Sequence, residues 1–184
     1  MKIAINGFGR IGRLVYRLMK EDDFFDVVAI NDLSSSEELA YLLRYDTNHR
    51  TYDKDITFDE EGIIVDGKKT RVYSEMDPSN LPWGELGIDL VFECTGKFTK
   101  KEDANKHILA GAKKVLISAP GKGDMKTVVY NVNDDILTSD DVIVSAASCT
   151  TNCLAPIVKV LDDNFGIERG FMTTIHAYTN DQVT

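Results

Sequence analysis

The sequence predicts an α/β protein with a doubly wound, mostly parallel sheet, and three observations lead to this fold class. Short apolar segments alternate with segments whose apolar residues recur at helical spacing, and this alternation is typical of βαβ units. The first apolar segment runs into a glycine-rich turn that opens a helix, as in the first unit of such sheets. Closely spaced turn residues in the middle of the chain predict an antiparallel hairpin insertion.

The first three elements follow one another with short connections. Residues 2–6 and residues 25–31 are apolar segments of strand length and predict two strands. Residues 10–19 between them predict a helix, because apolar residues recur on one of its faces. The residues of this predicted core face are Ile11, Leu14, Val15 and Leu18.

Two overlapping capping boxes mark the start of the second helix. In a capping box, a serine and the glutamate three residues later each accept a hydrogen bond from the other's backbone N–H. Ser34 with Glu37 and Ser35 with Glu38 both fit this pattern. Either box predicts a helix that continues through Leu39.

The middle of the chain changes to short strands joined by turns. Residues 56–58, 63–65 and 70–73 predict three strands, and the Asp66-Gly67 pair before the last of them is the strongest turn signal. A loop punctuated by two prolines is expected over residues 77–84. The pattern then predicts a helix over residues 101–110 and strands over residues 88–93, 115–118, 128–130 and 142–145.

The glycines after the first strand form a G-x-G-x-x-G pattern in the context of a strand, a turn and a helix. Gly7 permits a tight turn, Gly9 lets the backbone approach a pyrophosphate, and Gly12 lets the helix pack closely on the strand. The helix N-terminus adds N–H groups that favour phosphate. We therefore predict a dinucleotide site at Gly7, Phe8, Gly9, Arg10, Ile11 and Gly12.

Residues that end later strands extend this predicted site. Asp32 follows the second strand, where a carboxylate accepts hydrogen bonds from ribose hydroxyls and repels the 2′-phosphate of NADP, so NAD is favoured. The alternative for Asp32 is a turn or helix-cap role. Gly96 and Ser118 also follow strands of the predicted sheet and are expected to line the same cleft, although ordinary strand-end turns remain an alternative.

Cys149 lies between the apolar residues 142–145 and a helix predicted over residues 152–161. A thiol at a helix N-terminus is biased toward thiolate, although a lone cysteine is more often a packed small residue. His176, which follows the apolar-rich residues 171–175, is a candidate base, and a satisfied histidine at a strand end is the alternative. A cofactor site, a thiol and a base together indicate covalent redox catalysis.

Charge and cysteine content narrow the class of protein. The net charge of −9 argues against a nucleic-acid partner, and the apolar segments are too short to span a membrane. The N-terminus lacks the apolar core of a signal peptide. The three cysteines form no even framework, so the reducing cytoplasm is the expected compartment. Cys94, Cys149 and Cys153 have no metal-binding spacing. Cys94 is expected to be packed, and Cys153 to be an intrahelical partner or a packed small residue. His49 and His107 have no setting comparable to that of His176.

Four segments of the chain resemble the phosphorylating glyceraldehyde-3-phosphate dehydrogenase family. They are residues 4–13, residues 31–33, residues 145–156, which contain the sequence SCTTN around Cys149, and residues 174–182. The resemblance extends over essentially the whole chain, and the cysteine motif is highly specific. Residues 128–133 depart from it, because the family's usual glycine before Val-Asn is absent.

The resemblance implies a two-domain organisation. A Rossmann-type NAD-binding domain is expected over residues 1–148, and residues 149–184 are expected to begin an α+β catalytic domain of a longer protein. The family also implies NAD as the cofactor, a role in glycolysis, a cytoplasmic location and a homotetramer when the protein is full length.

The reaction implied by the resemblance passes through a covalent intermediate. Cys149 attacks the aldehyde of glyceraldehyde 3-phosphate, His176 acts as the base, and inorganic phosphate attacks the resulting thioester. Four further roles come from the resemblance alone: Ser148 and Thr150 bind the attacking phosphate, Thr179 contacts the substrate phosphate, and Asp181 orients an arginine outside this chain.

Two other functions remain open from the sequence. Erythrose-4-phosphate dehydrogenase shares the cysteine motif and oxidises a longer sugar phosphate, but residues 176–181 resemble the phosphorylating enzyme more closely. A non-catalytic module that binds NAD or a partner chain is an alternative from a different class, and the 184-residue chain alone is expected to be inactive because part of the active site lies outside it. Semialdehyde dehydrogenases are expected to differ around the cysteine.

Overall fold

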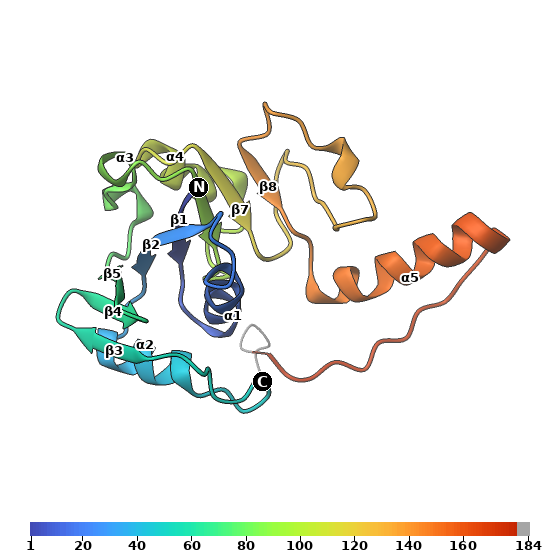
Figure 1. Cartoon of the computed structure of the whole chain (residues 1–184). Coiled ribbons are helices and arrows are strands. Elements are labelled where there is room, and N and C mark those ends of the chain that lie inside the picture. The colour runs from blue at the N-terminus through green and yellow to red at the C-terminus, as the bar shows by residue number, and fades with distance from the viewer. Residues whose placement is uncertain (180–184) are drawn as a thin grey trace.

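A computed structural model of the protein describes residues 1–179. Figure 1 shows a sheet with helices on both faces and one long helix that stands apart from it. The strands are β1 (Lys2–Asn6), β2 (Asp26–Asn31), β3 (Ile56–Asp59), β4 (Gly62–Val65), β5 (Lys68–Tyr73), β6 (Leu90–Glu93), β7 (Lys114–Ile117) and β8 (Ile143–Ser145). The helices are α1 (Arg10–Met19), α2 (Ser36–Arg44), α3 (Trp83–Leu86), α4 (Lys101–Leu109) and α5 (Cys149–Phe165), with short 3₁₀ turns η1 (Pro78–Asn80) and η2 (Asp134–Ile136).

The sheet has eight strands in the order β3-β4-β5-β2-β1-β6-β7-β8. β1 pairs in parallel with β2 on one side and with β6 on the other, and β7 and β8 continue the parallel arrangement. The predicted hairpins are present, because β4 is antiparallel to both β3 and β5. Since β5 also pairs in parallel with β2, the hairpin insertion extends the same sheet.

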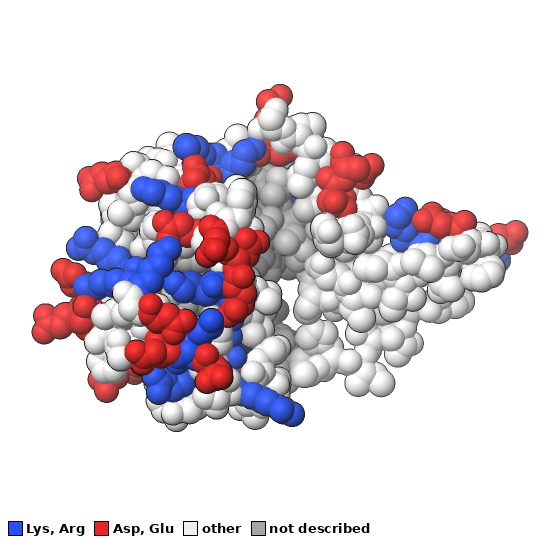
Figure 2. All heavy atoms as spheres, viewed as in Figure 1, with Lys and Arg blue, Asp and Glu red and all other residues white. Residues whose placement is uncertain are grey.

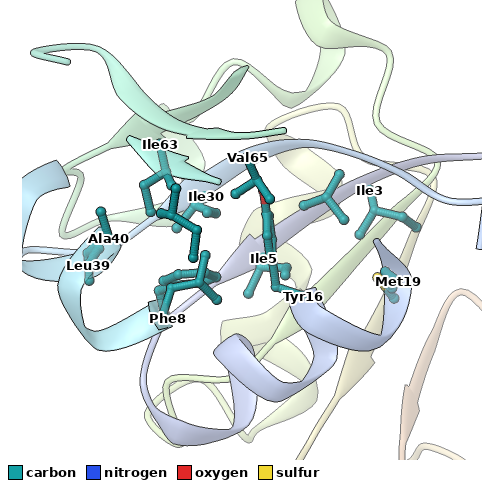
Figure 3. Packing of buried hydrophobic residues seen from close by; sticks show 13 residues of the cluster. Ile3, Ile5, Phe8, Tyr16, Met19, Ile30, Leu39, Ala40, Ile63 and Val65 are labelled. Carbon is teal, nitrogen blue, oxygen red and sulfur yellow. The ribbon is translucent and has the colours of Figure 1, made fainter. Parts of the chain in front are cut away.

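Two apolar clusters cover the opposite faces of the sheet. Ile3 and Ile5 of β1 belong to the first cluster, whereas Ala4 belongs to the second, as the alternation of side chains along a strand requires. Figure 3 shows the first cluster, which includes Phe8 and Tyr16. Residues of α1 and α2 close it, and residues of α3 and α4 close the second.

Helix α1 is rotated relative to the predicted core face. Its buried residues are Gly12, Tyr16 and Met19, whereas Ile11 and Leu18 are exposed. The cause is the close packing of Gly12, where an added Cβ would lie 2.2 Å from the carbonyl oxygen of Gly7. This contact faces Gly12 toward the sheet and brings the residues one and two turns later to the core.

The second capping box is the one that forms. The Ser35 hydroxyl accepts a hydrogen bond from the Glu38 N–H at 3.2 Å, and the Glu38 carboxylate accepts one from the Ser35 N–H at 3.1 Å. Helix α2 therefore begins at Ser36. At the helix that carries Cys149, Ser148 is the N-cap, so α5 begins at Cys149, three residues before the predicted start.

Three predicted elements differ from the structure. The predicted loop over residues 77–84 is partly helical, because it contains η1 and because buried Trp83 opens α3. Residues 128–130 form no strand: Val128 and Val129 are buried, but the chain turns at Asn131 with φ of 58°. No strand follows β8 within residues 1–179, so the apolar-rich residues 171–175 and His176 do not lie on a strand.

The part of the chain after β8 stands away from the sheet. Helix α5 contains no buried residue, and Ile157, Val160 and Phe165 are exposed on it. Figure 2 shows charged side chains gathered over the sheet domain, whereas the surface along α5 and the segment after it is largely uncharged except near the far end of the helix. Within residues 1–179, no helix has the length and apolar character required to cross a bilayer.

Candidate active site

The glycine turn after β1 has the backbone geometry that its three glycines predict. Gly7 has φ of 90°, and a Cβ there would lie 2.7 Å from the Thr95 backbone nitrogen. A Cβ at Gly12 would also collide, with the Gly7 carbonyl oxygen. By contrast, a Cβ at Gly9 would meet nothing within 4 Å. Gly7 and Gly12 therefore serve close packing, and Gly9 leaves open space at the N-terminus of α1.

The open space at Gly9 fits a pyrophosphate. Gly9 is the N-cap of α1 and no side chain caps the helix, so the first N–H groups of α1 keep their affinity for an anion. Arg10 lies beside them and pairs with Asp46 at 3.1 Å, and Ile11 is exposed. The side chain of Phe8 lies in the apolar core, so only its backbone faces this site.

Asp32 is held beside the glycine turn by two backbone groups. Its Oδ2 accepts a hydrogen bond from the Phe8 N–H at 2.7 Å, and its Oδ1 accepts one from the Ser34 N–H at 3.0 Å. An ionised carboxylate has about four acceptor positions, so each oxygen retains a lone pair for a ribose hydroxyl. The carboxylate therefore also fits the adenosine end of NAD.

Gly96 and Ser118 lie at the same carboxyl edge of the sheet. Gly96 has φ of 72° and open space beside its Cα. Ser118 donates hydrogen bonds from its N–H and its hydroxyl to the carbonyl oxygen of Glu93. Cys94 is close by and packs against the first apolar cluster, as expected, and this burial raises the pKa of its thiol to about 12. Cys94 is therefore not a nucleophile at neutral pH.

The N-terminus of α5 presents Cys149 in a fixed turn. The Ser148 hydroxyl accepts a hydrogen bond from the Thr151 N–H at 2.9 Å. The Asn152 side chain donates to the carbonyl oxygens of Ala146 and Ser148, at 2.7 and 2.9 Å. Ala147 adopts φ of 62°, a conformation that costs a non-glycine residue about 1 kcal/mol or more and is common at functional sites. Ala147 and Asn152 were not predicted from the sequence, although Asn152 belongs to the cysteine motif.

Cys149 and His176 are in direct contact. Sγ of Cys149 lies 3.1 Å from Nε2 of His176, and Nδ1 of His176 donates to the carbonyl oxygen of Ala177 at 2.6 Å. The hydrogen bond with His176 is the main cause that lowers the pKa of Cys149; burial opposes it, and the Thr150 N–H supports it. The structure therefore brings together the predicted nucleophile and the predicted base.

The other residues predicted to bind phosphate or substrate are Ser148, Thr150, Thr179 and Asp181. Ser148 and Thr150 flank Cys149 at the start of α5. A pocket of about 260 Å³ lies beside the pair, between α5 and residues 172–176. Thr179 is exposed, and Asp181 lies outside the described residues. Among residues 1–179, the structure has no cluster of three or more side chains suited to a metal ion.

The thiol and the glycine turn follow different strands. Cys149 comes after β8, whereas the glycine turn comes after β1, and β6 and β7 lie between these strands in the sheet. Figure 1 shows α5 leaving the sheet domain beyond β8. The described residues thus form two groups, one fitted to a dinucleotide and one to covalent thiol chemistry.

Comparison with known proteins relates both groups to one family. Residues 1–101 match the family described as "Glyceraldehyde 3-phosphate dehydrogenase, NAD binding domain", and residues 148–184 match "Glyceraldehyde 3-phosphate dehydrogenase, C-terminal domain". The chain is 58% identical to the glyceraldehyde-3-phosphate dehydrogenases of Clostridium pasteurianum and Clostridium acetobutylicum over 183 residues. It is 57% identical to glyceraldehyde-3-phosphate dehydrogenase 2 of Bacillus subtilis.

These alignments cover a larger share of this chain than of its relatives. They include 99–100% of this chain but only 54–55% of each of the three relatives. The chain therefore spans about half the length of the curated relatives that it matches.

Proposed function

The chain belongs to the glyceraldehyde-3-phosphate dehydrogenase family, and from this premise we propose that it carries out the NAD-dependent oxidation and phosphorylation of glyceraldehyde 3-phosphate to 1,3-bisphosphoglycerate. Its N-terminal part is the family's Rossmann NAD-binding domain, and NAD is the cofactor. The observation that carries the proposal is the contact of 3.1 Å between Sγ of Cys149 and Nε2 of His176 at the start of a helix.

Cys149 is the nucleophile in the proposed reaction. Its lowered pKa increases the thiolate fraction at neutral pH. The thiolate attacks the aldehyde carbon, so a C–S bond forms while the carbonyl electron pair moves to oxygen. The N–H of Cys149, at the start of α5, and His176 stabilise the charge on that oxygen.

His176 is the proposed base. Because its Nδ1–H is bonded to the Ala177 carbonyl, Nε2 faces the sulfur and can receive a proton. Nε2 first takes the thiol proton and gives it to the oxygen of the adduct, which forms the thiohemiacetal hydroxyl. Neutral Nε2 then takes this proton back as the carbonyl re-forms and a hydride leaves the carbon. NAD, when bound, supplies the hydride acceptor.

Inorganic phosphate completes the proposed cycle. A phosphate oxygen attacks the thioester carbon, the C–S bond breaks, and the electron pair returns to the Cys149 sulfur. We assign binding of this phosphate to Ser148 and Thr150, because they flank Cys149 at the helix N-terminus. Thr179 is assigned to the substrate phosphate, and Asp181 to the orientation of an arginine from outside this chain.

The cofactor site is assigned to the edge of the sheet around the glycine turn. The open space at Gly9 supports backbone binding of the pyrophosphate, and the free lone pairs of Asp32 support ribose binding and NAD over NADP. The complete proposed set is Gly7, Phe8, Gly9, Arg10, Ile11, Gly12, Asp32, Gly96 and Ser118.

The domain boundary is placed after residue 148. In support, α5 begins at Cys149 and buries none of its residues, and the match to the C-terminal domain begins at residue 148. Residues 149–184 would then begin a catalytic domain. A homotetrameric full-length protein in the cytoplasm, acting in glycolysis, completes the proposal.

The test is NADH formation by the full-length protein with NAD and glyceraldehyde 3-phosphate, with and without inorganic phosphate, because the proposed site includes an arginine outside the 184-residue chain. Phosphate-dependent turnover by the full-length protein, lost in Cys149→Ser while NAD binding persists, is the expected result. A persistent acyl-enzyme in Cys149→Ser would refute the role of Cys149. Faster phosphate-independent turnover with erythrose 4-phosphate would favour the alternative substrate, and NAD binding without any turnover would favour a binding module.

A further inference from the structure

A row of buried polar side chains crosses the sheet at its carboxyl edge. Asn6, Asn31, Glu93 and His107 are each between 0 and 5% exposed. Buried polar groups destabilise a fold unless each one is hydrogen-bonded. The catalytic proposal uses none of these four side chains, so the reason for burying them together lies in another role.

Glu93 is the centre of this row. Its Oε1 accepts hydrogen bonds from the Thr95 N–H, at 2.8 Å, and from the Thr95 hydroxyl. Its Oε2 accepts from Asn6 Nδ2 at 2.6 Å and lies 3.0 Å from His107 Nε2. Four donors match the acceptor positions of an ionised carboxylate. Every lone pair of Glu93 is thus committed to a neighbour in the fold.

The tautomer of His107 is set by Trp83. The indole N–H of Trp83 can only donate, and it lies 3.0 Å from His107 Nδ1. Nδ1 is therefore the acceptor, and Nε2 carries the hydrogen that faces Glu93. His107 lies on α4 and orients the Glu93 carboxylate through this hydrogen bond, which a neutral imidazole can donate.

The row continues from Asn6 to the segment after β5. Asn31 Nδ2 donates to Asn6 Oδ1 at 2.7 Å and to the carbonyl oxygen of Glu75 at 2.9 Å. The Glu75 N–H in turn donates to Asn31 Oδ1 at 2.8 Å. The side chains therefore link the ends of β5, β2, β1 and β6, which are neighbours in the sheet.

Three of these residues come directly or shortly before a proposed cofactor residue. Asn6 precedes Gly7, Asn31 precedes Asp32, and Glu93 is followed by the turn that contains Gly96. The two turns also touch, because a Cβ on Gly7 would lie 2.7 Å from the Thr95 nitrogen. Glu93 bonds to both sides of this contact, to Asn6 on one side and to Thr95 on the other.

We propose that Glu93 is a positioning residue for the cofactor site, whose carboxylate holds the Gly7 turn and the Thr95–Gly96 turn in the arrangement that binds NAD. His107 and Trp83 orient the carboxylate. The hydrogen bond between Asn6 and Asn31 couples the carboxylate to the strand end that carries Asp32. The inference rests on the proposed location of NAD at this edge.

The test compares Glu93→Gln with a control in the same sheet. An amide replaces one acceptor oxygen by a donor, so either the Thr95 pair or the Asn6–His107 pair loses its partner. The control is Thr70→Val, which removes a fully buried hydroxyl that contacts Tyr16 and the Val27 carbonyl and neither turn. Two quantities are measured for each chain: the NAD dissociation constant by calorimetry, and amide hydrogen exchange at both turns without NAD.

Glu93→Gln is expected to raise the NAD dissociation constant by about tenfold or more, with faster exchange at the two turns and unchanged exchange in the β3–β4 hairpin. Thr70→Val should change the dissociation constant by less than about twofold. Equal weakening of NAD binding in both variants, or unaltered binding and turn exchange in Glu93→Gln, would overturn the proposal.

A second variant covers the case in which Glu93→Gln fails to fold. Asn6→Ala removes one of the four donors and the link to Asn31, and the same selective pattern is expected with a smaller increase. If the unaltered chain does not bind NAD, the proposed function fails. The exchange rates at the two turns then still decide whether Glu93 holds them.

Discussion

Sγ of Cys149 lies 3.1 Å from Nε2 of His176, although 27 positions separate the two residues. The first residue of α5 thereby meets a segment that contains no regular secondary structure. The contact lowers the pKa of the thiol, and the second ring nitrogen is fixed by the Ala177 carbonyl.

Replacing His176 by alanine should raise the pKa of Cys149, because the hydrogen bond with His176 is the main cause of its lowering. Less thiolate will then be present at pH 7, and alkylation by iodoacetamide should slow by about tenfold. Mass spectrometry of the alkylated peptides gives the rate. Cys153 in the same sample is the internal control, and equal slowing at both cysteines would contradict the assignment.

Substitutions at Gly9 and Gly12 should have separate effects, one on the affinity for NAD and the other on the stability of the fold. Gly12→Ala forces a Cβ to within 2.2 Å of the Gly7 carbonyl oxygen, and should lower the free energy of unfolding by about 1–3 kcal/mol. Gly9→Ala meets no atom within 4 Å, so stability should change by less than about 1 kcal/mol, while NAD affinity falls. Chemical denaturation and calorimetry measure the two effects; unchanged affinity in Gly9→Ala would place the pyrophosphate elsewhere.

Asp32→Asn should shift the preference between the two nicotinamide cofactors. The amide removes the negative charge that repels a 2′-phosphate, and it retains one oxygen to accept from the Phe8 or the Ser34 N–H. The ratio of NADP to NAD affinity should rise by about tenfold or more, equivalent to about 1.4 kcal/mol. Calorimetric titration with each cofactor gives the ratio, and parallel losses for both cofactors would indicate a structural role only.

Ser35→Ala should destabilise helix α2. The hydroxyl accepts the Glu38 N–H at 3.2 Å, and loss of such a cap costs about 1 kcal/mol. Ser34→Ala is the matched control, since Ser34 is not the N-cap of α2. Urea denaturation of both variants measures the difference, and equal destabilisation would mean that the first capping box also contributes.

Asp141 should contribute to the acid sensitivity of the fold. The hydrogen bond from Lys126, at 2.7 Å, is the main cause that lowers its pKa to about 2, followed by that from the Thr138 N–H. Because the folded pKa lies below the unfolded value of about 4, the stabilisation is present above pH 4 and is lost as the pH falls toward 2.

In Asp141→Asn this contribution is absent at every pH. The difference in melting temperature between the unaltered chain and the variant should therefore shrink between pH 4 and pH 2. Asp140→Asn makes the same change in charge at the neighbouring position and is the control. A constant difference across this range would show that the ion pair has no linkage to folding.

The elements that local sequence determines were predicted well. The Asp66-Gly67 turn fixes its hairpin with residues that are adjacent in the chain, and the serine–glutamate pair sets the start of α2. Features that depend on packing were missed. Trp83 is the first residue of α3, and its side chain is buried in the second apolar cluster. Val128 and Val129 are buried without joining a strand.

The residues of the candidate site divide in the same way, into those set by local sequence and those set by distant contacts. Gly7, Gly12 and Cys149 were recognisable because their roles arise from the adjoining strand and helix. The role of His107 was missed, since its partners Glu93 and Trp83 lie 14 and 24 positions away. One signal was present: Asn6, Asn31 and Glu93 are polar residues at the ends of three apolar strands.

The central position of β1 has a consequence for the order of folding. Its pairing with β2 is complete once residue 31 exists, but Asn6 pairs with Glu93, 87 positions later. Strand β1 is therefore open along one edge until β6 has been synthesised. Contacts of such long sequence separation slow folding, and an open edge can capture another chain in the meantime. The topology that creates the cofactor edge thus also sets a kinetic risk of misassembly during the interval between the synthesis of β2 and that of β6.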